Sequence, residues 1–87
     1  MPDPKDYAEL VKKLLPEAQK GDSQAQYHLG VLFNDGKGVT KDYKQAAQWF
    51  TKSAEKGEQK AQYYLGVLYY KGAVVPKDLE HAVYWLE

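Results

Sequence analysis

Apolar residues recur at helical spacing along the whole chain. In residues 6–20 they lie three or four positions apart, which places them on one side of a helix. Similar spacing returns in four later segments, and no segment shows the alternation of apolar and polar residues that is typical of a strand. The pattern therefore predicts an all-α chain of about five helices, over residues 6–20, 22–35, 42–56, 58–71 and 78–87.

Polar residues mark the expected helix ends. Asp22 and Asp42 stand where a side-chain oxygen can accept hydrogen bonds from the first turn of a helix, and Asp6 occupies a similar position before 6–20. Glu9 and Gln45 have the spacing that completes a capping box with Asp6 and Asp42. Three glycines follow the helices where C-terminal caps are common: Gly21, Gly36 and Gly57.

One residue conflicts with this helical pattern. Pro16 lacks a backbone N–H and its ring clashes with the carbonyl four residues earlier. We therefore expect a kink or a break near residues 15–16.

The chain also repeats itself. When it is shifted by 36 residues, 21–51 aligns with 57–87, and 14 of these 31 positions are identical. The same register places Lys5-Asp6-Tyr7 on Lys41-Asp42-Tyr43. Internal repeats of this length indicate a helical array. We predict a single domain with a half unit at 5–20, a first repeat at 21–56 and a second, truncated repeat at 57–87.

Two glycines fall in the middle of predicted helices, at Gly30 and Gly66. Each costs about 1 kcal/mol relative to Ala. We expect them to allow close approach of a neighbouring helix backbone, with the small residues Ala46 and Ala82 opposite.

The repeated residues resemble the Sel1-like repeat, a branch of the tetratricopeptide-type helical repeats. The first unit carries the pattern at Ala25, Leu29, Gly30, Phe33, Gly36, Gly38, Val39, Asp42, Ala46, Trp49, Phe50, Ala54 and Gly57. The second carries it at Ala61, Leu65, Gly66, Tyr69, Gly72, Val75, Asp78, Ala82 and Trp85. Val74 and Leu86 depart from it, replacing a loop glycine and an aromatic residue.

The resemblance implies a right-handed α-solenoid of antiparallel helix pairs that acts as an adaptor in protein complexes. In bacteria, such proteins are linked to signalling, envelope functions or host contact. A minority bind or hydrolyse cell-wall or β-lactam-type ligands, but those members resemble proteins that are cross-linked by disulfide bonds. Because this chain has no Cys, we do not extend that activity to it.

The composition of the chain argues against several classes of binding partner. Lys+Arg and Asp+Glu both number 12, so the formal net charge is zero, and all the basic residues are Lys. Bulk attraction to nucleic acid or anionic lipid is therefore not expected. No apolar run reaches the ~18 residues of a membrane span, and Met1 is not followed by a secretory signal. The sequence leaves both the cytoplasm and the periplasm open.

The titratable residues favour structural roles over chemistry. His28 and His81 belong to different predicted helices, and no further ligands accompany them to form a metal site. Asp22 and Asp42 could suggest an acid–base pair, but helix capping explains both. We expect no catalytic residue, no metal and no cofactor.

Two other motifs also have structural explanations. The pair Gly36 and Gly38 follows a helix and lacks the Lys-Ser/Thr of a phosphate-binding loop, so a turn is the better interpretation. Trp49 and Trp85 lie on the apolar stripes of their helices and are expected to pack in the core.

One row of side chains on the predicted helices has no packing partner within its own helix pair. On the predicted helices 22–35 and 58–71, several side chains point away from the faces that carry Leu29 and Leu65. In a stack, these helices would line a concave surface that can take a peptide. We expect a protein- or peptide-binding site there, formed by Gln24, Tyr27, Val31, Asn34, Lys60, Tyr63, Val67 and Tyr70, with Asp35 and Lys71 nearby.

The alternative for this row of side chains is that Tyr27 and Tyr63 only pack between adjacent repeats. His28 and Tyr64, one step round each helix, are expected to pack in that way.

The sequence therefore predicts a non-catalytic scaffold or adaptor that binds a protein or peptide, without nucleic acid and without membrane insertion. Two alternatives remain: an enzyme acting on a cell-wall or β-lactam-type amide, and a purely structural spacer. We also expect the chain to be part of a longer array. Its terminal apolar residues Val83, Trp85 and Leu86 would then be covered by self-association.

Overall fold

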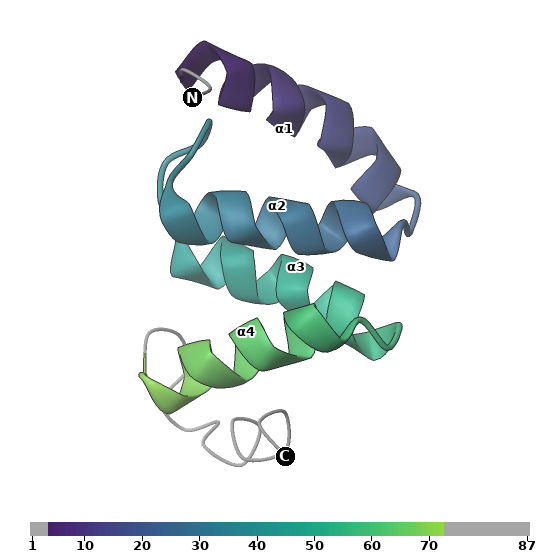
Figure 1. Cartoon of the computed structure of the whole chain (residues 1–87), viewed down its shortest axis with the longest axis vertical. Coiled ribbons are helices and arrows are strands. Elements are labelled where there is room, and N and C mark those ends of the chain that lie inside the picture. The colour runs from purple at the N-terminus through teal and green to yellow at the C-terminus, as the bar shows by residue number, and fades with distance from the viewer. Residues whose placement is uncertain (1–3, 73–87) are drawn as a thin grey trace.

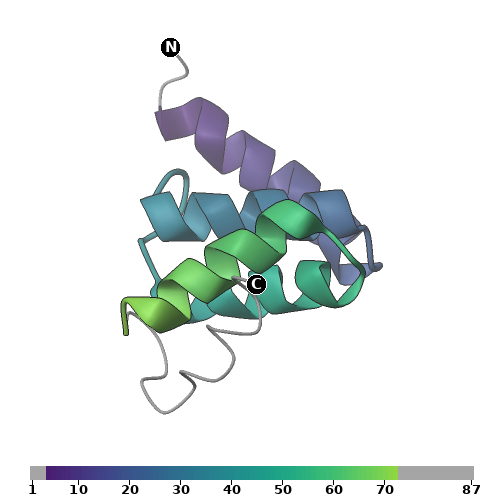
Figure 2. The ribbon, with the colours of Figure 1, turned by 60° about the horizontal axis from the view of Figure 1, so that its bottom comes forward.

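Four helices stack one after another in the computed structural model, which describes residues 4–72 (Figure 1). They are α1 (Pro4–Gln19), α2 (Ser23–Asp35), α3 (Tyr43–Glu55) and α4 (Gln59–Tyr70). Successive helices run in opposite directions and pack on one another, and α2 also contacts α4. Figure 2 shows α4 in front of the α2–α3 pair and α1 behind it. The predicted all-α solenoid of antiparallel helices is confirmed.

The predicted helix at 78–87 lies outside the described residues. So does the terminal surface of Val83, Trp85 and Leu86, whose coverage by another copy stays a prediction.

The helix ends follow the capping residues at two of the three predicted positions. One carboxylate oxygen of Asp42 accepts hydrogen bonds from the N–H groups of Lys44 (2.9 Å) and Gln45 (3.1 Å). Asp22 accepts one from the N–H of Ala25 at 3.0 Å. The prediction for Asp6 is wrong: α1 begins at Pro4, so Asp6 lies inside the first turn. A proline has no N–H to satisfy and suits the start of a helix, which extends α1 past the acidic residue.

Pro16 does not break α1. The helix continues through it to Gln19, and the Pro16 carbonyl accepts a hydrogen bond from the N–H of Lys20 at 3.1 Å. Of the expected kink or break near residues 15–16, the break is therefore wrong. The physical reason is that Leu14, Leu15 and Ala18 belong to an apolar cluster with α2, and this packing holds the last turn in place despite the missing N–H.

Two apolar clusters hold the stack together. The first joins α1 to α2 around the buried side chains of Ala18, Ala25 and Leu29. The second joins α3 to α4 around the fully buried Phe50 and Leu65. Alanines supply much of both clusters, so the helices can lie close together.

The ring of Phe50 explains the glycine in the middle of α2. A Cβ atom built on Gly30 would lie 2.5 Å from two carbons of that ring. The nearest atoms to Gly30 thus belong to an aromatic side chain of α3, which the sequence did not suggest, and the expected neighbour Ala46 is not among them. Ala82, the expected neighbour of Gly66, lies outside the described residues.

The loop between α2 and α3 folds back onto α1. Gly36 ends α2 in the left-handed conformation (φ 68°), and its N–H donates to the carbonyl of Leu32. Gly38 lies so close to α1 that a Cβ atom there would approach the Tyr7 carbonyl carbon and oxygen to 2.6 Å. The two glycines therefore form a turn, as predicted, and the corresponding Val74 lies outside the described residues.

Candidate protein-binding face

The side-by-side helices α2 and α4 share a face that is rich in tyrosine. We call it the α2–α4 face and define it by the eight predicted residues together with Gln59, Tyr64 and Lys71. Tyr27 is half-buried on it, with its ring centroid 6.2 Å from that of Phe50 and 6.0 Å from that of Tyr64. Tyr27 thus makes a contact between repeats, which favours the packing alternative for this residue.

Tyr64 is the centre of the contact between repeats. Its ring stacks on Phe50 with a centroid distance of 5.2 Å and an interplanar angle of 12°. This confirms that Tyr64 packs between repeats. His28, at the same register position of the first repeat, is exposed and contacts the ring of Tyr27 at 5.2 Å. Among the described residues the prediction for His28 is therefore wrong, because its ring contact is with Tyr27 of its own helix and not with another repeat.

Tyr63 differs from its repeat counterpart Tyr27. It is 61% exposed, and its ring meets Tyr64 edge-on at 6.1 Å. Tyr70 is still more exposed, at 72%. Val31 is half-buried against the cluster around Phe50. The eight predicted residues are therefore divided between packing and solvent-facing positions.

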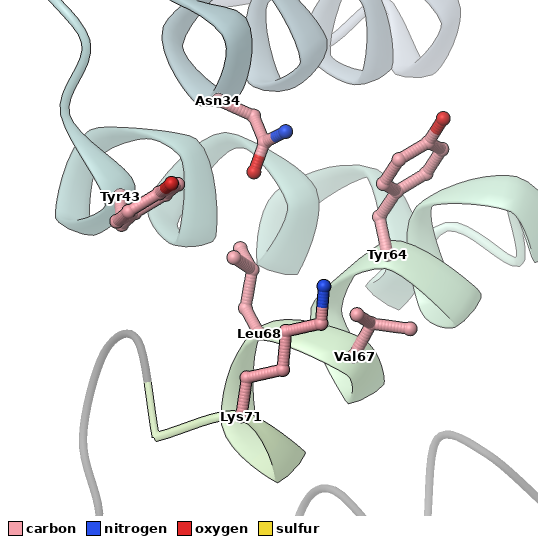
Figure 3. A pocket seen from close by; sticks show the side chains of 6 residues that line it. All are labelled: Asn34, Tyr43, Tyr64, Val67, Leu68 and Lys71. Atoms are coloured by element: carbon pink, nitrogen blue, oxygen red, sulfur yellow. The ribbon is translucent and has the colours of Figure 1, made fainter.

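The α2–α4 face carries two hollows. One is open, has a volume of about 500 Å³, and is lined by Tyr27, Gln59, Lys60, Tyr63 and Tyr64. The other, of about 200 Å³, is lined by Asn34, Tyr43, Tyr64, Val67, Leu68 and Lys71 (Figure 3). Since Tyr64 lines both, the two hollows adjoin one another at its ring.

These hollows bring together five of the eight predicted residues. Gln24, Val31 and Tyr70 line neither hollow. The sequence missed Gln59, Tyr43 and Leu68. Gln59 lies one turn before Tyr63 and could have been identified from helical spacing. Tyr43 lines the smaller hollow from α3, so it could be identified only from the tertiary structure.

Hydrogen bonds hold the acidic groups near this face. The side-chain amide of Gln24 donates to a carboxylate oxygen of Glu58 at 2.7 Å. The amide of Asn34 donates to Asp35 at 3.0 Å. Burial, then the neighbouring Tyr64 hydroxyl and then the Glu58 carboxylate raise the pKa of Tyr27 above its usual value of 10.0. The Tyr27 hydroxyl is therefore neutral at physiological pH and can donate a hydrogen bond.

Trp49 lies apart from the α2–α4 face. It is half-buried against the cluster that includes Val11 and Leu14, and the ammonium of Lys52 lies 4.9 Å from its ring centroid. Its predicted packing role is confirmed, but the fully buried aromatic residue of α3 is Phe50. Trp85 lies outside the described residues.

The described residues offer neither a metal site nor a membrane span. Within residues 4–72, the structure contains no group of three or more His, Cys, Asp or Glu side chains that could hold a metal ion. None of the four described helices is long and apolar enough to cross a membrane.

The fold and its repeated packing define a helical-repeat solenoid. The sequence profile described as the Sel1 repeat matches residues 23–58 and 59–87, and the chain belongs to the Sel1 repeat family. Members of this family are generally protein-interaction scaffolds and are typically non-catalytic.

A solved structure agrees with this assignment. The crystal structure of a Sel1 repeat protein from Oxalobacter formigenes superimposes with a TM-score of 0.81 and 34% sequence identity. The match covers 95% of this chain and 33% of that chain, so this chain spans about a third of its length. No curated protein matches the chain.

Proposed function

We propose that this chain is a non-catalytic interaction module that binds a protein or peptide segment on the α2–α4 face. The main observation that supports this proposal is the exposed ring of Tyr63. It stands at the edge of the larger hollow, beside the packed rings of Tyr27 and Tyr64.

Tyrosine suits such a role for a physical reason. Its ring offers a large contact area for the loss of only two side-chain rotations, and its hydroxyl can form hydrogen bonds. Tyr64 is stacked on Phe50 and so gives the larger hollow a fixed wall. A ligand side chain placed against Tyr63 would thus meet a preformed surface, which lowers the entropic cost of binding.

A structural spacer is the second candidate, and the packing of Tyr27 favours it. Tyr27 and Tyr63 occupy the same register position, and Tyr27 is partly covered by Tyr64 of the following repeat. In a spacer, Tyr63 would serve only to pack against a further repeat. The two functions therefore differ in what Tyr63→Ala changes.

The test is a selection of random peptides that bind the wild-type chain, followed by affinity measurements on variants. Tyr63→Ala should weaken the selected peptides by about 1–3 kcal/mol and leave the melting temperature nearly unchanged. The matched control is Leu10→Ala, because Leu10 is another exposed apolar residue (39%) and lies on α1. Peptides that bind Tyr63→Ala as tightly as the wild type would refute the proposed face.

A further inference from the structure

Two lysines stand at the two ends of the α2–α4 face. Lys60 lines the larger hollow and Lys71 lines the smaller one. Both are exposed, and neither has an ion-pair partner among residues 4–72. Several other lysines are engaged: Lys37, Lys41 and Lys52 lie over aromatic rings, and Lys56 donates to the Gly21 carbonyl.

The spacing of the two lysines places them on one side of α4. They are 11 residues apart, which is close to three full helical turns. Lys71 is the C-terminal cap of α4 and keeps a right-handed helical conformation. The two side chains therefore leave the helix in nearly the same direction, about 16 Å apart along its axis. Figure 3 shows the Lys71 side chain extending from α4 toward Asn34 and Tyr64.

Tyrosine and valine side chains occupy the distance between these charges. Tyr64 and Val67 lie on the same side of α4 as the lysines, and Tyr63 borders them. Two carboxylates near this face, Glu58 and Asp35, accept hydrogen bonds from the neutral amides of Gln24 and Asn34 and form no ion pair with either lysine. The face thus offers an apolar middle and an unpaired positive charge at each end.

We infer that the ligand of the α2–α4 face is an extended peptide with two carboxylates four residues apart. Side chains of an extended chain alternate between its two sides, so an even separation is needed to point both carboxylates at α4. At about 3.3 Å per residue, four residues span about 13 Å, and the long lysine side chains cover the remaining distance. Side chains between the two carboxylates would lie on Tyr63, Tyr64 and Val67. This inference rests on the proposed function and adds the charge and spacing of the partner.

The probe is the peptide acetyl-Glu-Val-Tyr-Val-Glu-amide, whose two glutamates lie four residues apart and whose β-branched residues favour an extended chain. One comparison peptide replaces both glutamates by glutamine. Another keeps two glutamates but places them two residues apart. Binding is measured by NMR titration of the full chain, and melting curves check that each variant is folded.

The expected result is a loss of about two- to fivefold in affinity for each glutamate that is replaced by glutamine. Lys60→Met and Lys71→Met should each remove the dependence on one of the two glutamates. Lys13→Met, which changes an exposed lysine of α1, should leave the affinity unchanged. Raising the salt concentration should reduce the difference in affinity between the charged and the neutral peptide, because both ion pairs are exposed to solvent.

Three results would overturn the inference. If the charged and neutral peptides bind with equal affinity, charge plays no part in binding. If the closely spaced peptide binds as tightly as the probe, the proposed spacing is wrong. The third is no binding of the probe at millimolar concentration. In each case the proposed function still stands if randomly selected peptides depend on Tyr63, and it fails separately if they do not.

Discussion

At the scale of single residues, the contact between Gly30 and Phe50 sets the separation of α2 and α3. A side chain at position 30 would collide with a ring that is fully buried, so either the ring or the helix backbone would have to shift. We expect Gly30→Ala to lower the free energy of unfolding by about 1–3 kcal/mol in urea titrations, as overpacking does.

The control for this substitution is the same change in a Phe50→Leu background. There the loss in free energy of unfolding should be smaller, because the aromatic ring has been removed. Helix propensity alone would have the opposite sign, since Ala is about 1 kcal/mol better than Gly inside a helix. A more stable Gly30→Ala chain would therefore show that the ring has room to move.

Tyr27 gives a second residue-scale prediction, for alkaline pH. Because folding raises the pKa of Tyr27, its contribution to stability is complete below the ordinary pKa of 10.0 and is lost as the pH rises through the raised value. The melting temperature of Tyr27→Phe should thus fall less steeply than that of the wild type between about pH 9 and 11. Tyr63→Phe, which removes the hydroxyl from an exposed ring, is the matched control, and parallel curves for Tyr27→Phe and wild type would contradict the prediction.

At the scale of the helices, α1 shows how packing overrides a local preference. Pro16 is exposed in the last turns of α1, and its ring occupies the place of a backbone hydrogen-bond donor. The helix is nevertheless continuous because its apolar stripe packs on α2. Local propensity is a weak guide where tertiary contacts are present.

Replacing Pro16 should therefore stabilise the chain. Pro16→Ala restores an N–H within α1 and removes the ring, although it also frees the unfolded chain. We expect a net gain of about 1–2 kcal/mol in the free energy of unfolding. Lys13→Ala, an exposed change in the same helix, should be close to neutral, and a loss of stability in Pro16→Ala would mean that the proline ring packs favourably.

At the scale of the whole molecule, stability depends on contacts between neighbouring repeats. In a solenoid each unit contacts only its neighbours, so an interface between repeats determines whether they unfold together. Here the rings of Tyr27, Phe50 and Tyr64 join α2, α3 and α4.

We expect Tyr64→Ala to uncouple the second repeat from the first. Amide hydrogen exchange should then show α4 losing protection before α2 and α3, whereas these helices exchange together in the wild type. Tyr63→Ala removes a neighbouring, exposed ring and should leave the order of exchange unchanged. Uniform loss of protection in Tyr64→Ala would indicate that the contact does not couple the repeats.

The sequence by itself determined the helices, their order and the repeat. These features depend on local and periodic information: the spacing of apolar residues, the capping aspartates and the glycines that end α2 and α3. Asp22, Asp42 and Gly36 lie where this reasoning placed them, because a cap is satisfied within a few residues of the chain.

Only the tertiary structure decided which aromatic residues pack and which face solvent. Tyr27 and Tyr63 are identical in register, yet one is half-buried and the other is 61% exposed. Tyr64 of the following repeat packs on Tyr27, whereas within residues 4–72 no following repeat packs on Tyr63. His28 and Tyr64 differ because Tyr64 stacks on Phe50 of the preceding repeat, whereas the ring contact of His28 is with Tyr27 of its own helix. Burial in a repeat array depends on which neighbouring helix is present, and two equivalent positions in a sequence do not carry that information.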